Sequence, residues 1–172
     1  EQKHGDLPYG YDHKYVYSHC GYNLKITDMQ AACGLAQLKK LDFFIEKRRS
    51  NYKYLRSRLS NLSNFLQLPT PTPNSNPSWF GFPITLKDDC GISRVDVTKF
   101  LDSHKIGSRL LFAGNLIKQP YFKDVTYRVS GGLEHTEKTM KDTFWIGVQP
   151  ALSEEHFDFV AEKFEELFGI NF

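Results

Sequence analysis

Two residues that suit anion binding, Asn23 and Lys25, precede a predicted helix near the start of the chain. The next segment, T-D-M-Q from Thr27, has the spacing of a capping box, in which the first and fourth side chains accept hydrogen bonds from backbone N–H groups. A helix N-terminus attracts negative charge, and an amide donor beside a cation would add two contacts to a phosphate. The pattern indicates a candidate anion site.

The first turns of this predicted helix consist mainly of small residues, with Ala31, Ala32, Gly34 and Ala36 at the front. Small side chains let another backbone come close, so this part of the helix is expected to pack tightly against a neighbouring segment. Ordinary helix packing explains the pattern without any ligand, whereas a nearby anion site would give it a function. The residues alone leave both interpretations open.

A long loop with polar side chains follows a predicted strand in the middle of the chain. The strand covers 105–112, and the loop AGNLIKQPYFKDVTYRVSGGLEHT covers 113–136. Long connections without secondary structure are uncommon in compact domains and are often functional. We expect polar groups of this loop to converge on a site.

The composition is that of an ordinary globular chain. Its 172 residues are 40% apolar and 24% charged, with a net charge of +2. Such a mild charge, with both signs interleaved, argues against nucleic-acid binding, and no apolar run predicts a membrane span. Cys20, Cys33 and Cys90 lack C-x-x-C spacing, which indicates reduced thiols in a cytoplasmic protein and no metal site. No signal peptide is recognised, and we expect the chain to begin within a longer protein.

The elements expected to position these groups alternate between helices and strands. A lead-in at 1–26, with a short strand at 14–18, precedes a helix from Thr27 to about Leu62. After a Pro-rich loop at 69–77, we expect strands at 78–86, 105–112 and 144–150 and helices at 93–104, 136–143 and 153–168. Phe80 and Val95 are expected in the core. We divide the chain into the lead-in, a long connecting helix at 27–66 and a small α/β domain at 67–172, in which helices flank a small sheet.

No motif of a self-contained enzyme is present. The sequence lacks a Gly-rich phosphate loop, G-x-S-x-G and H-E-x-x-H. Its six histidines are scattered and fit surface or hydrogen-bonded roles. We therefore assign no catalytic residue to this chain, which has the character of part of an enzyme or of a binding module.

The segment GYNLKITDMQAACGLAQLKKLDFFIEKRR closely resembles the signature G-Y-N-x-R/K-x-x-x-x-Q-A-A-x-G-x-x-Q-L-x-x-L of the DegT-type, pyridoxal-phosphate-dependent sugar aminotransferases. Together with SWFGFPITL and SRLLFAGNLIKQPYF, it is similar to the nucleotide-sugar 3-dehydrase branch of that family. The resemblance covers essentially the whole chain. It implies the C-terminal small domain of a fold-type I pyridoxal-phosphate enzyme.

The resemblance implies roles for six residues. It places Asn23 across a homodimer interface on the cofactor phosphate of the neighbouring subunit, with Lys25 beside it in place of the usual Arg. It places Arg109 on the diphosphate of a nucleotide sugar, for which a fork of donors is well suited. Surface exposure at a strand end is the simpler interpretation of that arginine. The resemblance further implies sugar contacts or pocket lining for Phe112, Asn115 and Gln119.

The reaction implied is loss of the C3 hydroxyl of a 4-keto-6-deoxyhexose, with pyridoxamine or pyridoxal phosphate as electron sink, in dideoxysugar and O-antigen synthesis. The family places the histidine base, the ring-binding groups and, in this dehydrase, a two-iron two-sulfur cluster upstream of this segment, and a reductase would be a partner. The three cysteines do not match the cluster motif. A nucleotide-sugar aminotransferase and a non-catalytic interaction fragment are the alternatives, and the nucleotide stays open between CDP and GDP.

Overall fold

The computed structural model describes residues 20–22 and 24–170. They divide into two compact units, one ending at Lys39 and the other beginning at Lys40. The predicted strand at 14–18 and Asn23 lie outside the described residues. Each unit is described by itself below.

The described part of the first unit contains helix α1, Asp28–Leu38, with the predicted capping box at its start. The Gln30 backbone N–H donates to Thr27 Oγ1 over 3.4 Å, and the Thr27 N–H donates to Gln30 Oε1 over 2.9 Å. None of the residues of α1 is buried. Tyr22, Leu24 and Met29 are 92%, 89% and 80% exposed, so this unit presents large apolar side chains without covering them.

The single long helix predicted from Thr27 to about Leu62 is wrong. After α1 the chain makes a turn at Lys39 and Lys40, helix α2 covers Leu41–Arg58, and the 3-10 helix η2 covers Ser60–Leu62. The turn contains neither Gly nor Pro, the residues that usually interrupt a helix, so the sequence offered no local signal for it. The division of the chain at 26 and 66 stays a prediction.

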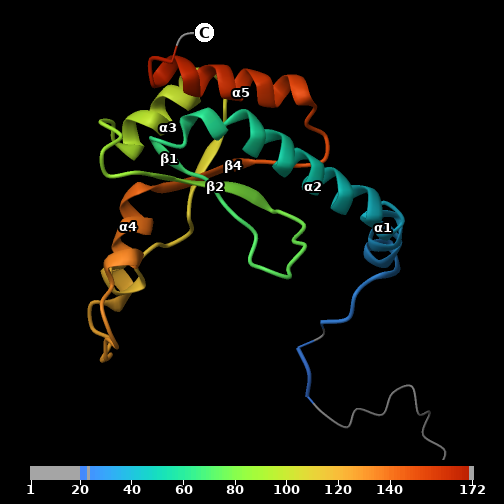
Figure 1. The fold of residues 1–172 in the computed structure, drawn as a ribbon. Helices are drawn as coiled ribbons and strands as arrows, with labels where there is room; N and C mark the ends of the chain where they lie inside the picture. The colour runs from blue at the N-terminus through green and yellow to red at the C-terminus, as the bar shows by residue number, and fades with distance from the viewer. Residues whose placement is uncertain (1–19, 23, 171–172) are drawn as a thin grey trace, which may run out of the picture. The chain divides into compact units, whose positions relative to one another are not determined.

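The second unit is built around a four-stranded antiparallel sheet (Figure 1). Its strands are β1 Leu66–Gln67, β2 Gly81–Leu86, β3 Ser108–Leu110 and β4 Thr143–Gly147, in the order β1-β2-β4-β3. The other helices are α3 Arg94–Ser103, α4 Glu134–Asp142 and α5 Glu154–Leu167, and the long loop contains the 3-10 helices η3 Leu116–Lys118 and η4 Pro120–Phe122. The predicted combination of a small sheet and flanking helices is confirmed, and β1 was missed.

Alternation along β2 and β4 decides which face of the sheet carries the core. Phe82, Ile84 and Phe144 have no exposed surface, and the side chains between them point to the opposite face. Helices α2, α3 and α5 lie on the buried face (Figure 1). Their core residues are Tyr52, Leu55, Val97, Leu101, Phe157, Ala161 and Phe164, joined by Leu59 directly after α2. One continuous apolar layer therefore fixes the sheet.

The other face of the sheet carries the row Pro83, Trp145 and Arg109, because Trp145 is the register partner of Pro83 on β2 and of Arg109 on β3. Two residues that we predicted to lie in the core, Phe80 and Val95, are exposed. Phe80 is 65% exposed because its ring lies against Trp145, with centroids 5.0 Å apart, on the outer face. Val95 is 48% exposed because Val97 occupies the buried side of α3.

Gly81 and Gly147 are register partners that differ in the space beside them, and this difference predicts opposite effects of alanine. A Cβ at Gly81 would lie 2.3 Å from Trp145 Cε3, whereas one at Gly147 would meet nothing within 4 Å. We expect Gly81→Ala to lower the free energy of unfolding by about 1–3 kcal/mol by displacing the indole. Gly147→Ala should be neutral or stabilise by about 0.4–1 kcal/mol, since it restricts the unfolded chain.

Urea unfolding, followed by tryptophan fluorescence, measures both changes. Equal effects of the two substitutions would contradict the packing of Trp145 over Gly81.

Candidate functional site

Arg109 lies on the edge strand β3 with its side chain exposed on the outer face of the sheet. Its guanidinium carbon is 5.8 Å from the centroid of the Trp145 ring, within the range of a cation–π contact. Trp145 is fixed in turn, since its Nε1 donates to the carbonyl of Leu110 over 3.1 Å. Arg109, which we predicted to bind a diphosphate, is therefore a cation that contacts Trp145 and faces solvent.

An apolar hollow of about 190 Å³ is lined in part by Trp145, the residue whose ring Arg109 contacts. Aromatic rings form most of its wall, and the lining residues are Trp79, Phe80, Gly81, Pro83, Leu111, Phe112 and Trp145. Trp79 is fixed from behind by stacking on Tyr52, with ring centroids 4.2 Å apart. The carbonyls of Trp79 and Phe80 accept hydrogen bonds from Arg48 Nη1 over 3.0 and 3.3 Å. The hollow is thus lined by side chains without a free polar group among the described contacts.

Phe112 has an unusual backbone conformation, with φ at +50° and its side chain 77% exposed. Bulky residues rarely adopt positive φ, and such residues persist where the surrounding structure determines them. Two residues later, Gly114 also has positive φ, and a Cβ there would lie 2.7 Å from Met140 Cγ on α4. The loop after β3 therefore packs closely against α4, two residues beyond Phe112.

A polar network completes the attachment of this loop to α4. Asn115 is 97% buried, accepts from the Ile117 N–H over 3.3 Å and donates from Nδ2 to Glu137 Oε1. Glu137 also forms an ion pair with Lys118. Hydrogen bonds from Lys118 and then Asn115 lower the pKa of the Glu137 carboxyl. Glu137 was missed by sequence reasoning, because one glutamate on a polar helix carries no distinguishing spacing.

The other predicted site residues occupy different places. Gln119 donates from Nε2 to the carbonyl of Ala113 over 2.7 Å, so the amide groups of both Asn115 and Gln119 bind protein partners and their sugar contacts stay predictions. Lys25 is exposed in the first unit, just before the capped helix, and Asn23 lies outside the described residues. Of the predicted set, Arg109 and Phe112 converge, because both lie beside Trp145.

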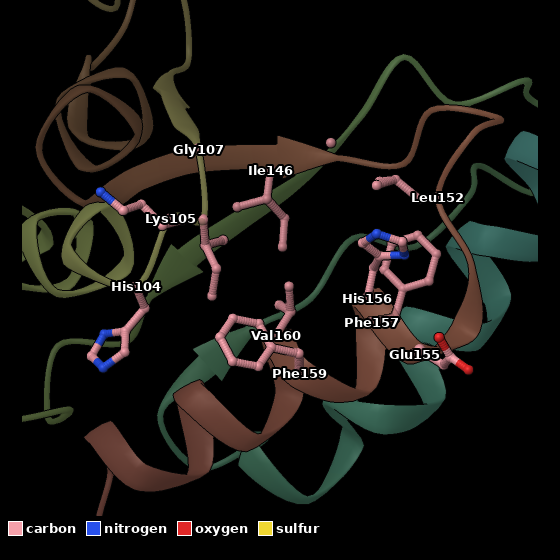
Figure 2. Close-up of a pocket in the computed structure, with 12 residues that line it drawn as sticks. His104, Lys105, Gly107, Ile146, Leu152, Glu155, His156, Phe157, Phe159 and Val160 are labelled. Carbon is pink, nitrogen blue, oxygen red and sulfur yellow. The ribbon is translucent and has the colours of Figure 1, made fainter.

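A larger pocket of about 610 Å³ lies on another part of the second unit and contains none of the predicted site residues (Figure 2). Ile146 of β4 and Val160 of α5 line it, together with the segment His104–Gly107 and the start of α5. Its two histidines are engaged in helix ends: His104 Nδ1 is 2.8 Å from the Phe100 carbonyl, and His156 Nδ1 is 2.7 Å from Ser153 Oγ. These contacts give both rings a structural role.

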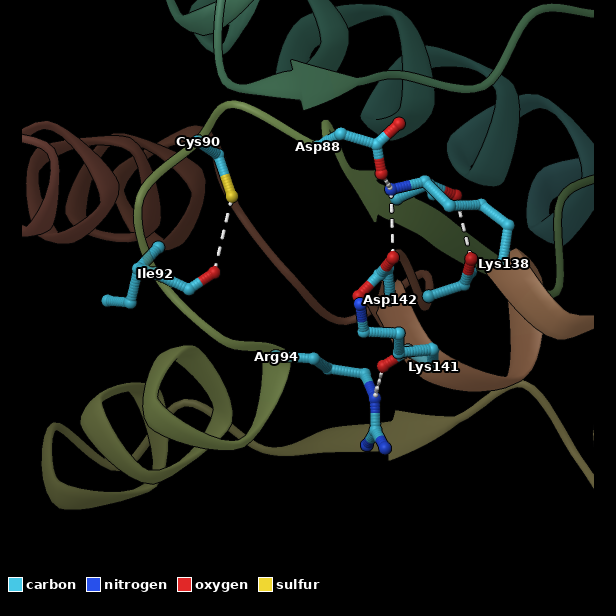
Figure 3. Close-up of polar contacts among 9 residues, drawn as sticks. Asp88, Cys90, Ile92, Arg94, Lys138, Lys141 and Asp142 are labelled. Atoms are coloured by element: carbon cyan, nitrogen blue, oxygen red, sulfur yellow. Dashed lines mark hydrogen bonds and ion pairs between the residues drawn. The ribbon is translucent and has the colours of Figure 1, made fainter.

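A charged cluster joins α4 to the segment after β2 (Figure 3). Lys138 Nζ is 2.6 Å from an Asp88 oxygen and 2.8 Å from an Asp142 oxygen, and Arg94 Nε donates to the Lys141 carbonyl over 2.7 Å. The hydrogen bond from Lys138 lowers the pKa of Asp88. Within residues 20–22 and 24–170, no group of three histidine, cysteine or acidic side chains could hold a metal ion. The cluster therefore has a structural role, since it connects α4 to the segment after β2.

Comparison with known proteins decides the family. A sequence profile of the DegT/DnrJ/EryC1/StrS aminotransferase family matches residues 2–165. The chain belongs to this family. It is 61% identical over 99% of its length to the lipopolysaccharide biosynthesis protein RfbH of Salmonella typhimurium, of which it covers 39%. It is also 48% identical over 94% of its length to a dTDP-4-dehydro-2,6-dideoxy-D-glucose 3-dehydratase of Saccharopolyspora spinosa, of which it covers 35%.

The solved structures of the family agree with the fold. A GDP-4-keto-6-deoxymannose-3-dehydratase with a trapped PLP–glutamate geminal diamine superposes with a TM-score of 0.77 at 28% identity, over 87% of this chain and 38% of that one. The predicted small domain of a pyridoxal-phosphate enzyme is confirmed at the level of fold. The chain spans less than half the length of these relatives. None of the described helices is both long and apolar enough to cross a membrane.

The attachment of the loop to α4 predicts a pH-dependent defect. Asn115→Asp replaces the donor to Glu137 with a second carboxylate, so repulsion should lower the melting temperature near pH 7. The Glu137 carboxyl has a lowered pKa, so it stabilises the native state at a pH above its pKa in the unfolded chain, which is about 4.3. Acidification protonates Glu137 and removes this stabilisation from the parent protein. In the variant, the same protonation removes the repulsion between the two carboxylates. The difference in melting temperature should therefore shrink below about pH 4.

Thermal unfolding across this pH range measures the effect. Combining Asn115→Asp with Glu137→Gln exchanges donor and acceptor and should recover stability at pH 7. A deficit that is independent of pH and persists in the double variant would contradict the network.

Proposed function

We propose that this chain forms the C-terminal part of a pyridoxamine-phosphate-dependent nucleotide-sugar 3-dehydrase of the cytoplasm. The enzyme would remove the C3 hydroxyl of a 4-keto-6-deoxyhexose in the synthesis of dideoxysugars for O-antigens. The observation that carries this proposal is the 61% identity to RfbH over 99% of the chain, joined by the 48% identity to a 3-dehydratase. Both values far exceed the 28–29% identity to the GDP-perosamine synthase of Caulobacter vibrioides and to EpsN of Bacillus subtilis.

Substrate binding is proposed for Arg109. The exposed guanidinium at the free edge of the sheet can approach a ligand from solvent, and its contact with Trp145 limits its motion. A planar fork of donors matches the paired oxygens of a diphosphate, and preorientation reduces the entropy lost on binding. The residue would therefore grip the diphosphate of the nucleotide sugar. Asn115 and Gln119 would act mainly by holding the loop that carries Phe112.

Cofactor binding is proposed for the first unit. Lys25 is exposed directly before the N-terminus of α1, and a cation beside free helix N–H groups fits the chemistry of a phosphate. Asn23 is proposed to contact the same phosphate on the neighbouring subunit of a homodimer, following the family signature. When bound, pyridoxamine phosphate supplies an amine for the C4 ketone and an electron sink. This chain's part is to bind and orient, while the base, a two-iron two-sulfur cluster and the contact to a reductase are proposed for the remainder of the enzyme.

The reaction is tested on the full-length protein that contains this chain. Incubated with pyridoxamine phosphate and the CDP-, GDP- or dTDP-linked 4-keto-6-deoxyhexose, it should form a product of the substrate that has lost the C3 hydroxyl, as seen by mass spectrometry. With pyridoxal phosphate and glutamate, the alternative aminotransferase would instead give an amino sugar. Accumulation of the amino sugar without dehydration would contradict the proposal, and so would failure to bind any nucleotide sugar.

Arg109→Lys tests the proposed diphosphate contact, since lysine keeps the charge and loses the fork. In the full-length enzyme we expect nucleotide-sugar binding to weaken by about 1–3 kcal/mol, the range for hydrogen bonds to charged groups. Cofactor affinity should be unchanged. Calorimetric titrations with substrate and with cofactor measure the two effects separately. A selective loss of cofactor binding would place Arg109 at the wrong end of the site.

A further inference from the structure

The indole of Trp145 makes contacts on both strands that flank β4. Its six-membered ring covers Gly81 on β2, where a Cβ would lie 2.3 Å from Cε3. Its Nε1 donates over 3.1 Å to the carbonyl of Leu110 on β3, which lies on the other side of β4. The ring of Phe80 meets it with centroids 5.0 Å apart. These contacts together fix the position of the indole on the outer face.

Gly81 leaves the space that the indole occupies on β2. Trp145 is the register partner of Pro83, and Gly81 lies two residues before Pro83 on the same face of the strand. A side chain at position 81 would therefore enter the volume of the six-membered ring. Gly147, the register partner of Gly81, has no neighbour within 4 Å of its added Cβ. The need for glycine is thus specific to position 81.

The orientation of Arg109 depends on this indole. Within residues 20–22 and 24–170, the Arg109 guanidinium forms no hydrogen bond or ion pair, and it lies 5.8 Å from the centroid of the Trp145 ring. An arginine side chain has many rotamers, and a contact that restricts them in the free protein reduces the entropy lost on binding. The contact with the ring uses none of the N–H groups that a diphosphate would accept.

We propose that Trp145, placed by Gly81, is a positioning residue that orients the Arg109 guanidinium for a diphosphate. The inference rests on the proposed function, in which Arg109 binds the nucleotide sugar. It adds two residues that act through Arg109 and that need no contact with the ligand themselves. The affinity of the enzyme for a diphosphate therefore depends on a glycine of β2, two strands away from the arginine of β3.

Calorimetric titration of the full-length enzyme with CDP, GDP and dTDP tests the proposal without turnover. We expect Trp145→Leu to weaken binding about two- to tenfold, the range for immobilising one flexible side chain. Trp145→Phe keeps an aromatic face and loses only the anchoring N–H, so its effect should be smaller. Gly81→Ala should also weaken binding because it displaces the indole, whereas Gly147→Ala should leave the affinity unchanged.

Trp79→Leu is the matched control. Trp79 is half-buried like Trp145, but its ring stacks on Tyr52, with centroids 4.2 Å apart, rather than on Arg109. Its removal should lower the melting temperature and leave the affinity for nucleoside diphosphates unchanged. Equal losses of affinity in Trp79→Leu and Trp145→Leu would overturn the proposal, since any disturbance of the outer face would then have the same effect.

A double-mutant cycle with Arg109→Ala separates positioning from direct contact. In that background, Trp145→Leu should change the affinity by less than about twofold, because the indole acts only through Arg109. An undiminished effect would overturn the proposal, since the indole would then bind the ligand itself. If Trp145→Leu does not fold, Trp145→Phe and Gly81→Ala provide the same comparison.

The outcomes also separate this proposal from the proposed function. Unchanged or tighter binding in the Trp145 variants, with binding still weakened by Arg109→Ala, would overturn the positioning role and leave the diphosphate contact intact. Parent-like binding of nucleoside diphosphates by Arg109→Ala would overturn both.

Discussion

The ring of Trp145 organises the outer face of the sheet. It lies over Gly81, where no side chain could fit, and between its register partners Pro83 and Arg109. It also donates a hydrogen bond to the Leu110 carbonyl and meets the ring of Phe80. One half-buried indole thus contacts a cation, forms part of an apolar wall and holds the end of a strand. The outer face can carry a rigid site because the inner face is fixed separately by the core.

The loop after β3 depends on a second constraint, its attachment to α4. Gly114 packs against Met140, and the buried amide of Asn115 joins the loop to Glu137. A buried polar group needs its partners, so this contact specifies one loop conformation more strongly than apolar packing alone would. Phe112, with its positive φ, lies at the start of this attached loop. Local strain is thereby placed beside Arg109, where the proposed function requires a precisely shaped surface.

Sequence patterns predicted the parts of this structure that depend on local signals. The capping box at Thr27 and the helix starts at Ser93 and Ser153 are confirmed, as are the three predicted strands. The break at Lys39 and Lys40 was not predictable, because it contains no helix-breaking residue. The exposure of Phe80 depends on Trp145, 65 positions later, and the structural role of Asn115 depends on Glu137. Contacts between residues that are far apart in the sequence cannot be recognised from residue spacing. The sequence was therefore enough to recognise the family signature, whereas the geometry of the site could be seen only in the folded structure.

The central claim is that Arg109, held beside Trp145, binds the diphosphate of a nucleotide sugar. A crystal structure of the full-length enzyme with a nucleoside diphosphate 6-deoxyhexose tests it most directly. The account predicts diphosphate oxygens within hydrogen-bonding distance of the Arg109 guanidinium, with that guanidinium still beside the Trp145 ring. A diphosphate bound elsewhere, with no contact to Arg109, would contradict it.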